Sequence, residues 1–146
     1  MTGTVERQPL ICDTGALLDY LVATSPDHPM FRRAIDRART RYVPGLVLAE
    51  VDYFLRDERK AMAALLEDLR RGAFTLVSTT LPLLERAMAI DTLYEDLRLG
   101  LVDAYLVALA EFLGVPRIAT RDVRDFSAVK LRDGRSLELV APPRSR

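Results

Sequence analysis

Four acidic residues occur where an isolated carboxylate would be costly. Asp13 ends a short apolar run, Glu50 and Asp103 lie within strongly apolar segments, and Asp122 follows a later apolar run. Burying an unpaired carboxylate costs several kcal/mol, and few basic residues lie close to these acids in the sequence. Carboxylates that gather in one place repel each other, and the simplest relief is a divalent cation. We therefore interpret the four acids as candidates for a catalytic metal site.

The available ligand types favour one class of metal. Cys12 is the only cysteine and His28 the only histidine. This argues against a zinc site built from cysteine or histidine, a disulfide framework and a triad with a histidine base. Oxygen-only ligation points to Mg²⁺ or Mn²⁺. His28 itself lies in the polar stretch Ser-Pro-Asp-His-Pro, where we expect a solvated loop residue.

The segment Leu10–Cys12 predicts how the first acid is positioned. It is too short for a helix and suits a strand buried on both faces, with Asp13 at its carboxyl end. Thr14 and Gly15 are expected to form a turn, followed at once by an apolar helix over residues 16–21. Because open α/β sheets bind ligands at the carboxyl ends of their strands, Asp13 is expected to face a crevice.

Strands and helices alternate along the rest of the chain. Helical spacing predicts helices over residues 30–39, 45–55, 58–71, 81–93 and 101–110, with a short helical turn within 120–126. Short apolar runs predict further strands over residues 41–44, 74–77, 115–119 and 137–140. This alternation favours an α/β three-layer sandwich with a mostly parallel central sheet of about five strands flanked by helices. The most apolar helix is expected to be buried, and Asp103 with its first turn.

Length and composition indicate one globular domain spanning residues 1–146, with a flexible N-terminus over 1–8 and an irregular tail over 141–146. No apolar run approaches the length of a membrane span, and the polar start lacks the core of a signal peptide. We therefore expect a soluble, cytoplasmic protein without membrane contact. The charges are uneven, since basic segments at 32–41 and 115–146 flank an acidic one. This pattern suits a polyanionic partner, or simply solvated helix faces.

Each acid also has a simpler role open to it. Asp13 could cap the following helix, and Glu50 could pair with a nearby base. Asp103 could favour the positive end of its own helix, and Asp122 could be a helix cap, with Asp125 as a rival. The predicted topology favours a single site for these acids, because the ends of the first and fourth strands can be neighbours in a parallel sheet.

Four motifs then occur in order: Ile-Cys-Asp-Thr-Gly-Ala-Leu-Leu, Pro-Gly-Leu-Val-Leu-Ala-Glu-Val-Asp-Tyr, Leu-Gly-Leu-Val-Asp-Ala with Leu-Val-Ala-Leu-Ala, and Ile-Ala-Thr-Arg-Asp-Val-Arg-Asp-Phe. With these motifs the chain resembles the PIN-domain ribonucleases, and within them the VapC-type toxins of prokaryotic toxin-antitoxin pairs. The second motif selects Glu50 over Asp52. The fourth places Thr120 and Asp122 at its polar positions and leaves Asp125 outside.

The resemblance implies a Mg²⁺- or Mn²⁺-dependent endoribonuclease that uses metal-activated water to cleave cellular RNA. The residues implied are Asp13, Glu50, Asp103 and Asp122 as catalytic and metal ligands, Thr14 and Thr120 as secondary polar positions, and Arg121 and Arg124 as contacts to RNA phosphates. It also implies a VapB-type antitoxin that covers the crevice, and a homodimer. The alternative is a PIN-like module that binds or processes RNA without being a toxin.

Two positions depart from the family pattern. Gly15 stands where many relatives have Ser or Asn, and Gly100 where some relatives carry a further acid, which leaves one or two metal ions open. Two other α/β classes fit less well. A phosphate-accepting receiver domain needs an Asp after the third strand, where Ser78 stands, and a haloacid-dehalogenase-type phosphatase needs a second Asp at position 15.

Overall fold

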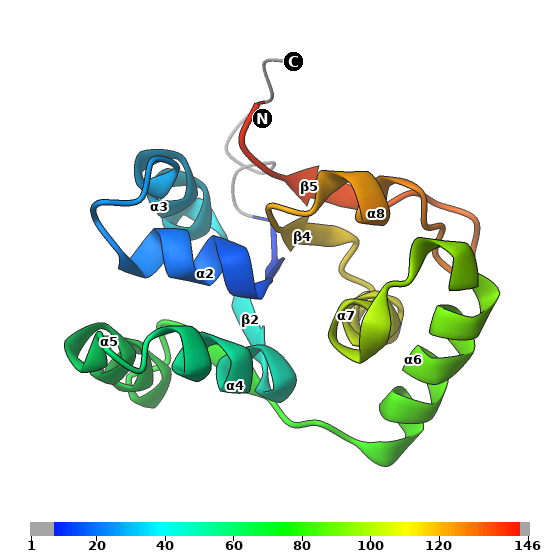
Figure 1. Ribbon diagram of the computed structural model, residues 1–146, viewed down its shortest axis with the longest axis horizontal. Coiled ribbons are helices and arrows are strands. Elements are labelled where there is room, and N and C mark those ends of the chain that lie inside the picture. Colours follow the sequence, from blue (N-terminus) through cyan, green and yellow to red (C-terminus); the bar gives the residue numbers. More distant parts are fainter. Residues whose placement is uncertain (1–7, 144–146) are drawn as a thin grey trace.

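The central strand of the fold is β1 (Leu10–Cys12), the first apolar run of the chain. The computed structural model describes residues 8–143 (Figure 1), so most of the predicted flexible N-terminus and residues 144–146 of the predicted tail lie outside it. The other strands are β2 (Arg41–Pro44), β3 (Thr75–Val77), β4 (Arg117–Ala119) and β5 (Glu138–Val140). Their order is β3-β2-β1-β4-β5 and every neighbouring pair is parallel. The predicted sheet is therefore confirmed.

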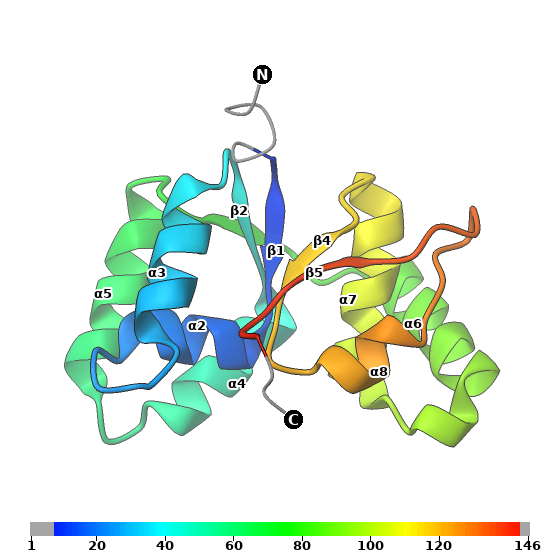
Figure 2. The same cartoon turned by 90° about the horizontal axis from the view of Figure 1, so that it is seen from above.

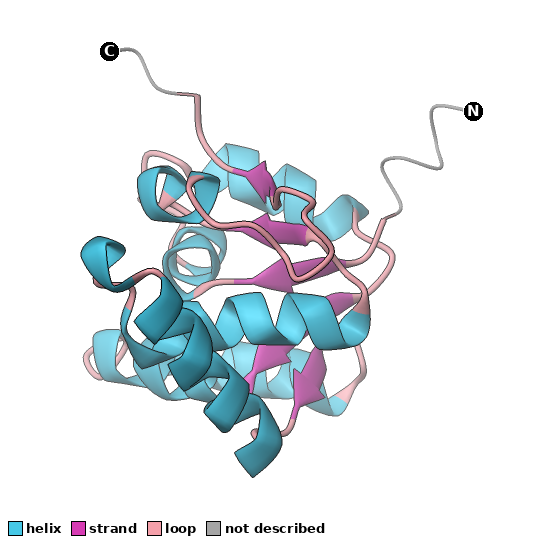
Figure 3. Ribbon diagram, turned by 90° about the vertical axis from the view of Figure 1, so that its right-hand side faces the viewer, coloured by secondary structure: helices cyan, strands magenta, loops and turns pink. Residues whose placement is uncertain are grey.

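Helices cover both faces of this sheet. The helices are α2 (Thr14–Leu21), α3 (His28–Arg37), α4 (Gly45–Phe54), α5 (Arg59–Arg70), α6 (Leu81–Leu93), α7 (Gly100–Leu113) and α8 (Val123–Ser127), with a 3-10 turn η1 (Glu95–Leu97). Figure 2 shows α2, α3 and α5 on one side of the sheet and α6 and α7 on the other. In Figure 3 the strands lie layered between these helices. The three-layer sandwich is confirmed.

The position of β1 explains its composition. Leu10, Ile11 and Cys12 are completely buried, as expected of a parallel strand that has helices on both faces. Cys12 lies opposite Ala119 of β4, and the next residue, Asp13, donates its backbone N–H to the Ala119 carbonyl at 2.9 Å. The ends of the first and fourth strands are thus neighbours, as predicted.

Helix α7 is the most buried helix of the fold. Its residues 104–110 are all buried between the sheet and α6, which confirms the prediction from its apolar composition. The expectation that Asp103 is buried with the first turn was wrong. Leu101 in that turn is 41% exposed and Asp103 is only half-buried, because this turn faces the open hollow described below.

Three local features differ from the predictions. Thr14 and Gly15, which were expected to form a turn, are the first two residues of α2, because Asp13 caps the helix. His28 is the first residue of α3 rather than a solvated loop residue, and its Nδ1 lies 2.9 Å from the Asp19 carbonyl oxygen, which half-buries the ring. The turn η1 was not predicted, since three residues carry no periodicity. The predicted cap of α6 is confirmed, because Thr80 Oγ1 accepts from the Leu83 N–H at 3.4 Å. Among residues 8–143, no helix combines the length and apolarity needed to span a membrane.

Candidate active site

The four predicted acids meet at the carboxyl edge of the sheet. Asp13 follows β1, Glu50 lies on α4, Asp103 on the first turn of α7, and Asp122 in front of α8. They line one hollow of about 360 Å³, together with Thr14, Gly15, Leu18, Phe54 and Arg121. A parallel sheet directs the end of each strand to this edge, so residues 109 positions apart (13 and 122) come together without any local sequence relationship.

Asp13 is held from two directions. Its Oδ1 accepts the Thr14 backbone N–H at 2.7 Å, which caps α2, and its Oδ2 accepts the Thr120 hydroxyl at 2.7 Å. Burial raises the pKa of Asp13, and these two hydrogen bonds oppose that rise in part. Asp13 therefore serves both as a helix cap and as a fixed carboxylate in the hollow.

Glu50 and Asp52 point to different sides of α4, as their spacing predicts. The Thr14 hydroxyl donates to Glu50 Oε1 at 2.5 Å, which ties Glu50 to the start of α2. Asp52 pairs with Arg59 at 2.8 Å, half-exposed and outside the hollow. The simpler reading of Glu50 as part of a surface ion pair is not supported among the described residues. The hollow thus receives Glu50 and not Asp52.

Asp103 and Asp122 lie close enough to share a proton. Burial, the nearby charge of Asp13 and a hydrogen bond with Asp122 raise the pKa of Asp103 from 3.8 to about 8. One carboxylate oxygen from each of Asp103, Asp122 and Asp125 lies within 4.8 Å of the others. Asp122 also caps α8, accepting the Asp125 N–H at 3.4 Å.

Asp125 is the acid that the sequence interpretation left outside. Its signal in the sequence was its spacing, because residues three apart share one face of a helical turn. It pairs with Arg124 at 3.5 Å, and its own side chain is 17% exposed. Asp125 thus lies close to Asp103 and Asp122, although it does not itself line the hollow.

The hydroxyl groups of both predicted threonines form hydrogen bonds with the acids. Thr120 is completely buried, and its hydroxyl donates to Asp13 and accepts the Asp122 backbone N–H at 2.9 Å. Thr14 connects Asp13 to Glu50, because its backbone N–H donates to Asp13 and its hydroxyl donates to Glu50. The two threonines therefore hold the carboxylates of Asp13 and Glu50 and the backbone of Asp122.

The donor set suits a hard divalent cation. Within residues 8–143, none of the four acids forms a direct ion pair with Arg, Lys or His. Burial, and after it the negative charge of the neighbouring acids, raises the pKa values of Asp13 and Asp103. Cys12 points into the core, and burial raises the pKa of its thiol to about 12. Only carboxylate and hydroxyl oxygens remain, and such ligands fit Mg²⁺-like ions.

The two predicted arginines differ in their surroundings. Arg121 lines the acidic hollow and also a neighbouring hollow of about 450 Å³ that Asp122, Val123 and Arg124 share. Its guanidinium is held by Asp19. Arg124 projects into solvent with 91% of its side chain exposed. Both lie beside the acids, Arg121 in a fixed position and Arg124 in a loose one.

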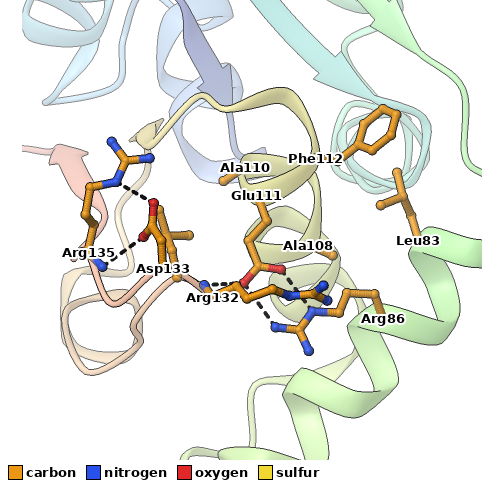
Figure 4. Close-up of a pocket in the computed structure, with 10 residues that line it drawn as sticks. Leu83, Arg86, Ala108, Ala110, Glu111, Phe112, Arg132, Asp133 and Arg135 are labelled. Atoms are coloured by element: carbon orange, nitrogen blue, oxygen red, sulfur yellow. Dashed lines mark hydrogen bonds and ion pairs between the residues drawn. The ribbon is translucent and has the colours of Figure 1, made fainter.

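A further hollow lies away from the acids. It measures about 410 Å³ between α6, the C-terminal end of α7 and the 131–135 turn (Figure 4). Its charges are paired: Arg86 forms two hydrogen bonds to Glu111, and Arg135 pairs with Asp133 at 2.8 Å. Glu111 also accepts the Arg132 N–H at 2.8 Å, so these contacts fasten the turn to α7.

Proteins of known function or structure are similar to this chain in sequence and in fold. The family model for the PIN domain matches residues 10–131. Ribonuclease VapC26 of Mycobacterium tuberculosis is 39% identical over 124 residues, which are 83% of this chain and 92% of that protein.

Solved structures agree in fold. Mycobacterium tuberculosis VapC20, described as a Sarcin-Ricin loop cleaving toxin, superposes with a TM-score of 0.72 at 20% identity, covering 82% of this chain and 94% of that one. A toxin-antitoxin complex from Klebsiella pneumoniae gives 0.66 at 19% identity, with 82% and 92% covered. VapBC2 of Rickettsia felis, bound to a promoter DNA fragment, gives 0.66 at 13% identity, with 93% and 100% covered. The chain therefore belongs to the PIN domain family, and within it to the VapC group.

Proposed function

We propose that this protein is an endoribonuclease that depends on Mg²⁺ or Mn²⁺ and acts as the toxin of a toxin-antitoxin pair. The observation that carries the proposal is the meeting of Asp13, Glu50, Asp103 and Asp122 in one hollow without a direct cationic partner among the described residues. The similarity to Ribonuclease VapC26 over most of the chain supports RNA as the substrate. We infer that the chain works as a single domain in the cytoplasm, where its RNA substrate is found.

Asp13 and Asp103 would hold the metal directly, and Glu50 and Asp122 would complete its surroundings directly or through water. When bound, such an ion activates water and offsets negative charge on the phosphodiester. Thr14 and Thr120 orient the carboxylates through hydrogen bonds of 2.5–2.7 Å. Asp125 is a further candidate ligand because of its position beside Asp103 and Asp122.

Arg121 and Arg124 would bind RNA phosphates beside the reacting one. Guanidinium groups suit phosphate because they keep their positive charge and carry five N–H donors, of which Arg121 directs only part to Asp19. Attack by water on the phosphodiester then leaves a 5′-phosphate and a 3′-hydroxyl. In this proposal the acids, oriented by the threonines, hold the metal ion, and the arginines hold the RNA strand that is cleaved.

We also infer that this protein binds two protein partners, an antitoxin and a second copy of itself. A VapB-type antitoxin is supported by the toxin-antitoxin complexes among the related structures. Phe54, which is 59% exposed and lines the acidic hollow, offers such a partner an apolar contact beside the acids. We further propose a homodimer, for which the exposed apolar side chains of α6 and α7 provide a surface: Leu81, Met88, Leu101 and Phe112. Light scattering of the purified chain tests this state.

The activity is tested by incubating total cellular RNA with the purified chain and Mg²⁺ or Mn²⁺. We expect discrete fragments that disappear with EDTA and with the Asp13→Asn and Asp103→Asn variants. Mapping the fragment ends identifies the target RNA. Absence of cleavage by folded, metal-binding, antitoxin-free protein would contradict the proposal and favour a PIN-like module that binds RNA without cutting it.

A further inference from the structure

Arg121 is held by a carboxylate that lies outside the acidic hollow. Its Nε donates to Asp19 Oδ2 at 2.8 Å and its Nη2 to Asp19 Oδ1 at 2.5 Å. The Asp19 side chain is only 3% exposed, whereas Arg121 is 46% exposed. The ion pair therefore joins a buried carboxylate to an arginine side chain that is about half exposed.

Asp19 is itself fixed in place. Ser25 Oγ donates to Asp19 Oδ1, and His28 lies against the Asp19 backbone carbonyl. Burial alone would raise the pKa of Asp19, but the hydrogen bonds from Arg121 and Ser25 outweigh it and lower the pKa. Asp19 is thus charged at neutral pH and aligned to receive both nitrogens of one arginine.

Gly15 provides the space through which Arg121 reaches Asp19. A Cβ atom at position 15 would lie 2.9 Å from Arg121 Cδ, 3.1 Å from its Cγ and 3.2 Å from its Nε. These atoms belong to a side chain whose end is anchored, so they cannot move aside without breaking the pair with Asp19. Because Gly15 has no side chain, Arg121 can pass close to it. This is also the position at which the sequence departs from many relatives.

The guanidinium lies where two hollows meet. Arg121 lines the hollow that holds the four acids and also the neighbouring one formed with Val123 and Arg124. A nucleic acid strand whose reacting phosphate lay at the acids would continue past Arg121 if it followed these two hollows. The position of Arg121 is set by Asp19, 102 residues away in the sequence.

We propose that Asp19 is a positioning residue that holds Arg121 in the gap left by Gly15, so that Arg121 binds the RNA phosphate adjacent to the one that is cleaved. This inference deepens the proposed function and depends on RNA being the substrate. The competing explanation is that the ion pair only fastens the 120–124 loop to α2.

The Arg86–Glu111 pair is a matched control. Arg86 also donates Nε and Nη2 to a single carboxylate, at 2.9 and 3.1 Å, and both side chains are largely buried. That pair lies at the hollow of Figure 4, away from the four acids. Glu111→Gln should lower the melting temperature about as Asp19→Asn does, without affecting RNA binding.

The test measures KM and kcat on an oligoribonucleotide that contains the mapped cleavage site. Arg121→Ala should raise KM about tenfold with kcat largely unchanged, since it removes one charge-assisted contact to phosphate. Asp19→Asn and Gly15→Ala should raise KM in the same direction. Neither should raise it further when added to Arg121→Ala, because both act through that side chain. Gly15→Ala changes no charge, so it keeps the test valid if Asp19→Asn unfolds.

A binding measurement separates this inference from the proposed function. Fluorescence anisotropy with a labelled single-stranded RNA of mixed sequence, in EDTA and over a salt series, reports phosphate contacts without cleavage. Arg121→Ala should reduce the slope of log K against log salt by about one, and Asp19→Asn should reproduce part of that loss. If the wild type binds RNA this way but cuts none, the proposed function fails, and the part of the inference that stands is that Asp19 positions Arg121 to bind an RNA phosphate. An unchanged slope in Arg121→Ala, or equal effects of Asp19→Asn with and without Arg121, would overturn the inference.

Discussion

The hydroxyl of Thr120 donates a hydrogen bond of 2.7 Å to Asp13 Oδ2, across 107 residues of sequence. This contact joins the ends of β1 and β4 directly above the sheet, and it depends on the pairing of Cys12 with Ala119. The orientation of the most buried of the four acids in the hollow is therefore a product of strand register.

Replacing Thr120 with Val removes that donor at nearly constant volume. We expect the variant to bind Mn²⁺ about 10–100-fold more weakly, because residues that orient a ligand contribute on this scale. Calorimetric titration of the folded protein with Mn²⁺ measures the change. Thr120→Ser, which keeps the hydroxyl, should restore most of the affinity, and equal affinities for Val and Ser would show that the hydrogen bond does not matter.

Asp103 makes the metal-free protein sensitive to pH. Its pKa is raised from 3.8 to about 8, so between these values the folded state retains a proton that the unfolded state has lost. The contribution of Asp103 to stability therefore falls as the pH rises from about 4 to about 8. In EDTA, Asp103→Asn should melt about 3–6 °C above the wild type at pH 8, and the difference should shrink towards pH 4. Melting curves with a constant offset at all pH values would contradict this assignment.

Glu50 and Asp52 form a matched pair two residues apart on α4. Glu50→Gln should reduce cleavage at least about tenfold, because it removes a charge from the acidic hollow. Asp52→Asn should stay within about twofold of the wild type, since its partner is the exposed Arg59. Initial cleavage rates at saturating Mn²⁺ distinguish the two variants. Similar losses in both would contradict the assignment of Glu50 alone to the site, and a loss confined to Asp52→Asn would show that α4 presents the other face to the substrate.

The buried helix α7 carries much of the stability of the fold. Leu106 is completely buried, whereas Leu93 on the neighbouring α6 is 70% exposed. Leu106→Ala should lower the free energy of unfolding by about 2–5 kcal/mol, through lost burial and the cavity left behind. Leu93→Ala should change it by no more than about 0.5 kcal/mol. Urea denaturation measures both, and a large loss for Leu93→Ala would indicate that its face is covered in solution.

The order of strands and helices was predictable because its signals are local. The run at β1, the cap at Thr80 and the spacing in α5 each depend on residues a few positions apart. Even the strand β2 was predicted with its observed bounds. The helix ends and η1 were harder, since the last turn of a helix depends on packing that the sequence does not display.

In the candidate site, too, some features were predictable from local sequence signals and others depend on the folded chain. Periodicity placed Glu50 and Asp52 on opposite sides of α4, but only the resemblance to the family selected between them. The half-exposure of Asp103 was missed, because an apolar helix does not reveal which turn faces a hollow. No local sequence signal distinguishes Asp19, since its partner Arg121 lies 102 residues away and only the folded sheet brings them together.

The pairing of β1 with β4 also sets when the protein becomes active. During synthesis the chain emerges from its N-terminus, so Asp13, Glu50 and Asp103 are made before β4 and Asp122 exist. Until β4 inserts beside β1, Thr120 cannot orient Asp13 and the acidic hollow lacks one side. A nascent chain that still lacks β4 therefore carries the first three acids without a complete acidic hollow.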